Sequence, residues 1–297
     1  MKAETPVADF KVAVSAENTP YIAWQTLLFC FSALRRLGKY PTVVVHRSAA
    51  ALLPEFEIVR SWGFPVVEAP QFRNHPKGEY PPRNELGSLL TIACLPEFKR
   101  GHVLFCEPDM LFVKRPQYAS ELSAEHYTYL DYTQKRVCDA ARKFGLEDRV
   151  SQLNETSPIG VPYLIPASEL GRIARRWIEV LDSFEELQWI DIMYAFGLAL
   201  AIEGLTARKT EFMAHNYDPL KKLDRDIIHY CYGDWRWDKR AFKNGHSPLT
   251  SGPLPPKKGL SGTVLGEILN QLQQARAYSQ FPNLSGRILR LAAAAVS

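Results

Sequence analysis

The residues best suited to chemistry lie between His102 and Arg115, in the segment HVLFCEPDMLFVKR. An apolar run ends at Glu107-Pro108-Asp109, and a second apolar run follows directly. Two carboxylates spaced by one proline after a strand suit Mg²⁺ or Mn²⁺, hard cations that bridge protein oxygens to phosphate oxygens. A charged turn between two strands is the alternative interpretation of the same pattern.

The elements around this segment alternate between strands and helices, which predicts an α/β fold with a mainly parallel sheet and flanking helices. In such a sheet, ligands bind at the carboxyl ends of the strands, where the two acids lie. Ser168 is a candidate cap for one helix. The expected strands are 10–15, 42–46, 65–68, 102–106, 158–165 and 227–232, and the expected helices are 24–37, 84–95, 168–184, 189–202, 263–278 and 287–297.

Composition narrows the class of protein. A formal charge of +4 over 297 residues does not indicate a nucleic-acid surface. Five scattered cysteines without a CxxC pair favour buried thiols in a reducing compartment. The start MKAETPVADF does not resemble a signal peptide, and no window reaches about 20 uncharged apolar residues, so we expect a cytoplasmic enzyme without a transmembrane segment.

A Pro-rich stretch over residues 247–259 predicts the domain organisation. We expect residues 1–246 to form the catalytic domain and residues 247–297 to form a linker with a helical C-terminal extension. The basic and apolar tail from Arg287 to Leu291 suits either a peripheral membrane contact or packing on the domain or on another subunit of an oligomer.

Five blocks in a fixed order resemble GT-A glycosyltransferases, in particular the plant hydroxyproline O-arabinosyltransferases and the peptidyl serine α-galactosyltransferases. The blocks are YIAWQ (21–25), YPPRN (80–84), EPD with FVK (107–109 and 112–114), WIDIMYA (189–195) and IHYCYG (228–233). The resemblance implies a GT-A, Rossmann-like fold and transfer of a pentose or hexose from a UDP-sugar donor to a hydroxyl acceptor. It also implies retention of anomeric configuration and Mn²⁺ or Mg²⁺ as cofactor. The acceptor is left open as a glycan, a peptide or a small molecule.

The resemblance also assigns the metal ligands. Asp109 would bind the metal directly, and His229 would be the second protein ligand. Glu107 would act in catalysis by binding the metal through water or by contacting the donor ribose. The alternative for His229 is a core histidine bonded to a backbone carbonyl.

The donor contacts follow from the same resemblance. Arg83 and Asn84 would meet the donor, with Arg83 bonded to phosphate. The alternative is a helix start capped by Asn84. Ser15, Glu17 and Tyr21 lie after the first strand, where GT-A folds seat the base and the ribose.

Asp191 is a candidate on physical grounds. It is the only acid between residues 189 and 202, and a carboxylate on an apolar helix is costly unless it is paired or meets a polar site. In GT-A enzymes an acid from this region contacts the acceptor or sugar hydroxyls, which favours a catalytic role. The plant families carry their acid one position later, where this chain has Ile192, so a structural role stays open.

Three further groups lie in or near the strand at 227–232. Trp235 and Trp237 alternate with Arg236 and suit an acceptor platform. His215, His229 and Cys231 have a spacing that does not match zinc motifs, so we expect no zinc site. The basic run suits either a lid over the diphosphate or a solvated face, and it consists of Arg236, Lys239, Arg240 and Lys243.

Two other functions compete with glycosyl transfer. A nucleotidyltransferase also places metal-binding acids on an α/β sheet, but its usual Gly-rich loop is absent from AENTPY (16–21). A catalytically silent sugar-nucleotide binder is the other alternative, and the intact set of Glu107, Asp109 and His229 disfavours it.

Overall fold

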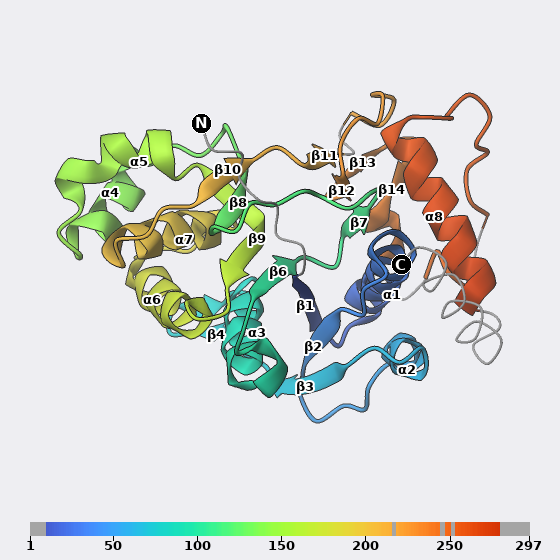
Figure 1. The fold of residues 1–297 in the computed structure, drawn as a ribbon, viewed down its shortest axis with the longest axis horizontal. Coiled ribbons are helices and arrows are strands. Elements are labelled where there is room, and N and C mark those ends of the chain that lie inside the picture. Colours follow the sequence, from blue (N-terminus) through green and yellow to red (C-terminus); the bar gives the residue numbers. More distant parts are fainter. Residues whose placement is uncertain (1–9, 216–217, 244–246, 251–252, 280–297) are drawn as a thin grey trace. The chain divides into compact units, whose positions relative to one another are not determined.

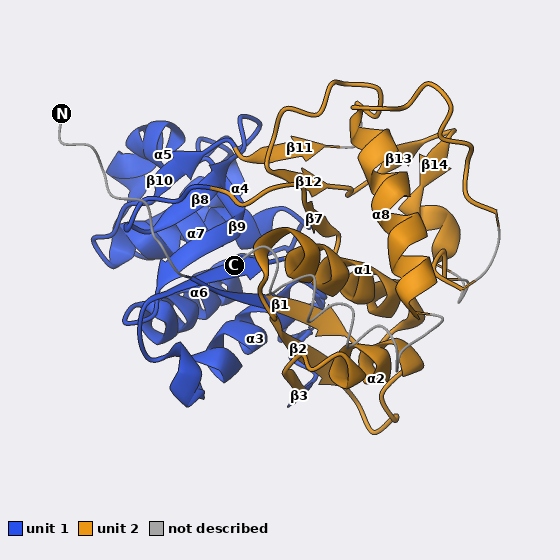
Figure 2. Cartoon of the chain, turned by 45° about the vertical axis from the view of Figure 1, so that its right-hand side comes forward, with its two compact units in different colours: residues 1–13, 69–106, 117–211 blue, residues 14–68, 107–116, 212–297 orange. Residues whose placement is uncertain are grey.

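The computed structural model describes residues 10–215, 218–243, 247–250 and 253–279. The chain divides into two compact units, each assembled from segments that are distant in sequence (Figure 2). Unit 1 contains residues 1–13, 69–106 and 117–211, and unit 2 contains residues 14–68, 107–116 and 212–297. The boundary predicted at residue 246 falls beside residues outside the described ranges and stays a prediction.

Unit 1 contains four strands of a mixed sheet. Their order is β10 (Arg208–Thr210), β8 (Ser123–His126), β9 (Ile159–Pro166) and β6 (His102–Cys106) (Figure 1). β10 is parallel to β8, whereas β9 is antiparallel to both β8 and β6. Three of the four strands therefore run in one direction, which confirms the predicted α/β class.

The helices of unit 1 bury apolar faces against one another. α3 (Arg83–Cys94) packs on α6 (Leu170–Ser183), and α6 packs on α7 (Asp191–Ile202), which also contacts β9. α7 is buried nearly all round, as its apolar sequence predicts. The buried stripe of α6 recurs at helical spacing and comprises Leu170, Ile173, Ala174, Trp177, Val180 and Leu181.

Short elements and helix caps of unit 1 differ from the sequence predictions. The hairpin β4 (Asn74–His75) and β5 (Gly78–Glu79) and the helices α4 (Lys135–Arg142) and α5 (Val150–Thr156) were not predicted, because segments this short carry little periodicity. The candidate cap Ser168 and the alternative cap Asn84 do not stand at the helix starts. Glu169 stands at the N-cap of α6 in place of Ser168, and Pro82 stands at the N-cap of α3 in place of Asn84.

Unit 2 contains strands in the order β1 (Lys11–Glu17), β2 (Thr42–Arg47) and β3 (Val66–Pro70), of which β1 and β3 each cross a unit boundary. Its first helix, α1 (Pro20–Leu37), begins earlier than the predicted residue 24. Thr19 caps this start by accepting a hydrogen bond from the Ile22 amide at 3.4 Å, and proline suits the first helical position. The second helix of the unit is α2 (Pro54–Ser61).

A small three-stranded sheet in unit 2 matters most for function. β12 (Ile227–His229) is its central strand, parallel to β11 (Met213–His215) and antiparallel to β7 (Met110–Phe112). The chain then forms a short hairpin of β13 (Gly233–Asp234) and β14 (Trp237–Asp238). This hairpin leads directly into a turn of 3₁₀ helix.

The predicted C-terminal helix is α8 (Val264–Ser279), and it belongs to unit 2. It packs on α1, with Arg36 and Glu267 paired at 2.6 Å and the rings of Phe31 and Tyr278 centred 5.2 Å apart. The Gln271 amide donates to the Phe112 carbonyl at 3.0 Å, which ties α8 to β7. The helix predicted at 287–297 lies outside the described residues.

Across the described parts of the chain, no helix combines the length and the apolar character that crossing a membrane requires.

Candidate active site

Sheet pairing in unit 2 brings the two acids and the histidine together. Glu107 and Asp109 immediately precede β7, and His229 ends β12, where it pairs with Met110. The Tyr230 amide donates to the Asp109 carbonyl at 3.0 Å, which extends the pairing by one residue. As a result, Nε2 of His229 lies 3.2 Å from Oε2 of Glu107 and 3.4 Å from Oδ2 of Asp109.

A buried lysine completes this cluster. The ammonium of Lys239 donates to Oδ2 of Asp109 and lies 3.4 Å from Oε1 of Gln25. The rings of Tyr21 and Tyr230 are centred 5.7 and 5.9 Å from Nζ, so aromatic faces surround the cation. The sequence indicated only a basic run here, and the burial of this one member was missed.

The charges of the cluster reinforce one another. Burial raises the pKa of Asp109, but the Lys239 ammonium and the His229 imidazole outweigh burial and hold this pKa well below its usual range. Burial lowers the pKa of His229, but Asp109 and Glu107 raise it well above its usual value. The site therefore holds an ionised Asp109 against two cationic side chains of the chain itself.

The same residues fit a divalent cation. One ligand atom from each of Glu107, Asp109 and His229 lies within 4.8 Å of the others, and all three residues are buried or half-buried. Carboxylate oxygens with one imidazole nitrogen suit Mn²⁺ or Mg²⁺. A bound cation would take over the positive charge that His229 and Lys239 supply to Asp109.

The predicted nucleotide contacts of unit 2 lie on β1 and α1. Tyr21 is in the first turn of α1, where its ring meets Trp24 edge-on at 6.3 Å and faces Lys239. The structure thus joins Tyr21 to the charged cluster. Ser15 and Glu17 lie within the carboxyl-terminal part of β1 rather than after it, and Ser15 is buried. Their contact with a base or ribose stays a prediction.

Arg83 and Asn84 belong to unit 1, where they organise the chain before α3. Arg83 forms an ion pair with Asp182 at 2.9 Å and donates to the Asn74 carbonyl at 2.8 Å. The side-chain oxygen of Asn84 accepts from the Phe72 amide at 2.8 Å. These bonds give both side chains a structural role. The predicted contact of Arg83 and Asn84 with the donor stays a prediction.

Asp191, also in unit 1, is fully buried at the start of α7. Its Oδ2 accepts from the Gln188 amide at 2.6 Å, and its other oxygen forms an ion pair with Arg136. The Arg136 guanidinium also lies 5.2 Å from the centre of the Tyr194 ring. The buried carboxylate therefore has the partner that an apolar helix requires, and its catalytic role stays a prediction. Arg136 further borders a cavity of about 420 Å³ lined with Gln134, Lys135, Asp139 and Gln188.

The basic run after β12 divides into different environments. Arg236 pairs with Asp234, and Arg240 pairs with Asp238, so each is held by an acid of its own loop. The aromatic pair divides as well. Trp235 is 86% exposed, whereas Trp237 is buried against Tyr230, with ring centres 5.9 Å apart. The expected platform of two tryptophans is therefore wrong for Trp237, because the β13–β14 hairpin turns that side chain inward.

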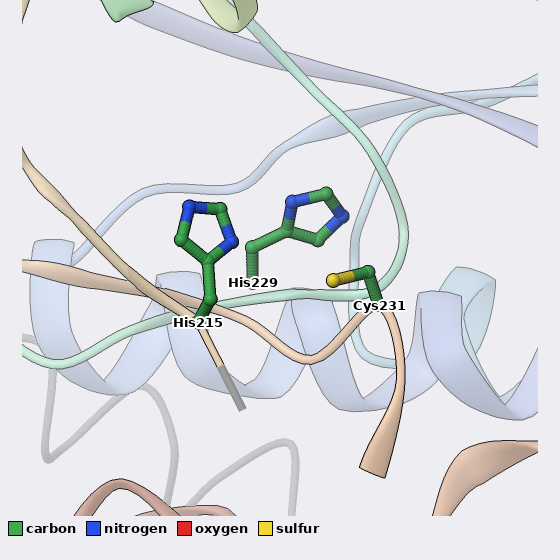
Figure 3. A group of neighbouring side chains, drawn as sticks. All are labelled: His215, His229 and Cys231. Carbon is green, nitrogen blue, oxygen red and sulfur yellow. The ribbon is translucent and has the colours of Figure 1, made fainter. Parts of the chain in front are cut away.

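The fold brings His215, His229 and Cys231 closer together than their sequence spacing indicates. Ligand atoms of these three residues lie within 4.8 Å of one another (Figure 3). Sequence spacing missed this cluster because its first member comes from a separate strand, β11, which pairs in parallel with β12.

Solved structures with this fold define the class. An active-site mutant of LgtC matches with a TM-score of 0.52 and 12% identity, over 90% of this chain and 96% of that chain. The galactosyltransferase LgtC in complex with donor and acceptor sugar analogues matches with a TM-score of 0.52 and 10% identity, over 90% and 95%. The chain has the fold of GT-A glycosyltransferases, as predicted.

Sequence comparisons point to one group within that class. Residues 89–210 match a family model described as the hydroxyproline O-arabinosyltransferase family N-terminal domain. Hydroxyproline O-arabinosyltransferase 3 of Arabidopsis thaliana is 23% identical over 91% of this chain and 82% of its own length. Hydroxyproline O-arabinosyltransferase NOD3 of Pisum sativum is 28% identical, over 57% of this chain and 58% of its own length. The chain thus spans little more than half of that second relative.

These findings confirm the resemblance predicted from the five sequence blocks and support a glycosyltransferase. The family match includes Glu107, Asp109 and Asp191 but ends before His229 and Lys239. The residues that complete the charged cluster therefore lie outside the matched segment.

Proposed function

We propose that this chain transfers a sugar from a nucleoside-diphosphate donor, with uridine as the expected base, to a hydroxyl group of an acceptor. The observation that carries the proposal is the cluster of Glu107, Asp109 and His229 with Lys239 buried against it. The GT-A fold and the named activities of the relatives support the same reaction. The relatives favour a pentose donor and a peptide hydroxyl, while a hexose donor and a glycan or small-molecule acceptor stay open.

The donor diphosphate would bind at this cluster. Asp109 and His229, with Glu107, would hold Mn²⁺ or Mg²⁺, and the bound cation would neutralise charge on the departing diphosphate. Lys239 offers a second cation at the same place. The Lys239 ammonium, which Gln25 also contacts, would donate to a phosphate oxygen if Asp109 held the metal.

The surroundings of the cluster strengthen these charge interactions. Lys239 is only 8% exposed, and the rings of Tyr21 and Tyr230 lie beside it. Exclusion of water lowers the local dielectric constant, so fixed positive charge stabilises the leaving diphosphate more than it would in solution.

The proposed chemistry is a front-face displacement with retention. The bond between the anomeric carbon and the diphosphate breaks while the acceptor oxygen bonds to the same face of that carbon. The hydroxyl proton passes to the departing phosphate oxygen. NMR assignment of the product anomer tests this step, and an inverted product would exclude it.

The exposed side chain of Trp235 is our candidate contact for the acceptor. It stands on the hairpin that leads into Lys239, and the Arg236 guanidinium stacks on it at 4.6 Å from the ring centre. A flat, exposed aromatic face next to a donor site suits stacking on a sugar or on a ring of a peptide.

Calorimetric titration of UDP, with and without Mn²⁺, tests the donor site. Wild-type protein should bind UDP more tightly with Mn²⁺, and Asp109→Ala should abolish the metal-dependent part. Asp224→Asn, which removes an exposed acid of the same unit, is the matched control and should behave as wild type. Failure of UDP to bind in the presence of Mn²⁺ would overturn the proposed donor. Metal-dependent hydrolysis of a UDP-sugar separates an enzyme from a silent binder.

A further inference from the structure

His229 stands between two different sets of donor atoms. On one side, the carboxylates of Glu107 and Asp109, which precede β7 in the sequence, lie near Nε2 of His229. On the other side, the parallel register pairs His229 with His215 of β11, and their ring centres are 5.7 Å apart. Residues opposite each other on paired strands share one face, so both rings lie on the same side of this sheet.

Cys231 supplies a third donor on the β11 side. It follows His229 by two residues, and Figure 3 shows its sulfur turned toward the two rings. Ligand atoms of His215, His229 and Cys231 all lie within 4.8 Å of one another, and each residue is partly buried. Nδ1 of His229 is buried and lacks a hydrogen-bond partner among the described residues, a condition that costs free energy unless another group satisfies the atom.

We propose that His215, His229 and Cys231 form a second metal site that binds Zn²⁺. One thiolate with two imidazoles selects Zn²⁺ over Mn²⁺ or Mg²⁺, which prefer oxygen ligands. Zinc bonds of about 2.1 Å to nitrogen and about 2.3 Å to sulfur at tetrahedral angles place ligand atoms roughly 3.5 Å apart. Small side-chain rotations bring atoms now within 4.8 Å to that spacing. Binding releases the thiol proton to solvent, and three protein ligands leave one position for water.

The shared histidine connects the two sites. Zn²⁺ on Nδ1 of His229 would add positive charge beside the oxygen-rich site and withdraw electron density from Nε2, the nitrogen that faces Glu107 and Asp109. Zn²⁺ therefore weakens Mn²⁺ binding at that site. This consequence rests on the proposed function, whereas the existence of the zinc site does not.

Co²⁺, which absorbs light where Zn²⁺ does not, is the spectroscopic probe for metal binding by His215, His229 and Cys231. Titration of the whole chain with Co²⁺ should give a thiolate-to-cobalt charge-transfer band in the near ultraviolet, which excess Zn²⁺ abolishes. Cys231→Ser should lack the band. Cys94→Ser, which removes an exposed thiol of unit 1, should keep it. Asp109→Asn should also keep it, because that carboxylate is outside this donor set. A band that persists in Cys231→Ser would overturn the proposal.

Zn²⁺ affinity, measured by competition with a chromophoric chelator, provides the second readout. Loss of a residue that only supports a metal ligand costs about 10–100-fold in affinity. Because His215 and Cys231 are proposed as direct ligands, His215→Gln and Cys231→Ser should each weaken Zn²⁺ binding by at least tenfold. Circular dichroism of the metal-free variants checks that both fold. Unchanged Zn²⁺ affinity in the two folded variants would exclude the site.

A final titration of Mn²⁺ with Zn²⁺ present tests the connection between the sites. Zn²⁺ should weaken Mn²⁺ binding in wild type and not in Cys231→Ser, whereas an equal effect in both would overturn it. If the cobalt band forms while UDP fails to bind with Mn²⁺, only the proposed function fails.

Discussion

Oδ2 of Asp109 accepts a hydrogen bond from the ammonium of Lys239, 130 residues further along the chain. The same oxygen lies 3.4 Å from Nε2 of His229. One carboxylate oxygen thus gathers two cationic side chains from separate segments into a buried place. The negative charge of Asp109 is therefore balanced by Lys239 and His229. A divalent cation that binds Asp109 has to displace at least one of these contacts.

Lys239→Met should lower the stability of the protein, because it removes one of the two positive charges beside Asp109. Removing one partner of a buried ion pair costs about 3–5 kcal/mol, so the free energy of unfolding should fall by roughly that amount without metal. Saturating Mn²⁺ should recover part of the loss, because the cation binds the folded site and satisfies Asp109. Urea unfolding with and without Mn²⁺ measures both values. Lys243→Met, at an exposed lysine, is the control, and an identical loss in both conditions would contradict the prediction.

The ion pair of Arg136 with Asp191 should be a structural element of unit 1. Arg136→Met and Asp191→Leu should each lower the free energy of unfolding by about 3 kcal/mol, because each leaves the other charge unpaired. The double variant should lose less than the sum of the single variants. Urea unfolding of the four proteins completes the cycle. Strict additivity would show that the pair contributes no coupling.

Asp191→Asn separates this structural role from the predicted catalytic role. If Asp191 acts in catalysis, turnover per folded molecule should fall well beyond the change that stability explains. Donor hydrolysis, normalised to the folded fraction, is the measurement. Turnover equal to wild type in the folded fraction would leave Asp191 with the structural role alone.

His75 should make the protein sensitive to acid. Burial lowers the pKa of His75, and the nearby Asp182 only partly offsets burial. Because the folded pKa lies below the ordinary value of about 6.5, the unfolded chain binds the proton more readily. The contribution of neutral His75 to the free energy of unfolding is complete above a pH of about 6.5. It is lost as the pH falls from there through the lower pKa of the folded state, by at most about 1.4 kcal/mol per pH unit.

His75→Gln should therefore flatten the dependence of unfolding free energy on pH between about pH 7 and pH 5. Urea unfolding at several pH values supplies the slopes. Parallel curves for wild type and His75→Gln would refute the assignment.

Trp235→Ala should affect the acceptor and spare the donor. The ring is 86% exposed, so its removal should leave the thermal midpoint unchanged. Loss of aromatic stacking should raise the KM for the acceptor about three- to tenfold while metal-dependent UDP binding stays at the wild-type level. Steady-state kinetics with an acceptor found by screening measures the first effect, and Trp189→Ala, at another exposed tryptophan, is the control. A loss of UDP binding would move Trp235 to the donor site.

Local patterns predicted the elements that depend on neighbours in sequence. The apolar run before Glu107 became β6, and the stripe centred on Trp177 became α6, because strand and helix periods are visible within a few residues. Ser168 and Asn84 do not stand at the N-caps of their helices, where Glu169 and Pro82 lie, because local sequence fixes a helix start only to within one or two residues.

Partners distant in sequence were beyond these patterns. Lys239 is one of four basic residues in an eight-residue stretch, 236–243, and only the packing of Tyr21, Gln25 and Tyr230 around it makes it a buried cation. Cys231 joins His215 only because two parallel strands lie in register.

The amino-acid sequence by itself determined the α/β class, the acid pair after β6 and the resemblance to GT-A glycosyltransferases, because each is written in contiguous blocks. Tertiary structure alone decided which cation faces Asp109 and which basic residue neutralises Asp191. It also decided which second set of potential metal ligands lies beside His229. A charge in a protein interior is stabilised by whichever opposite charge the fold brings within a few ångströms, and separation along the chain says nothing about that distance.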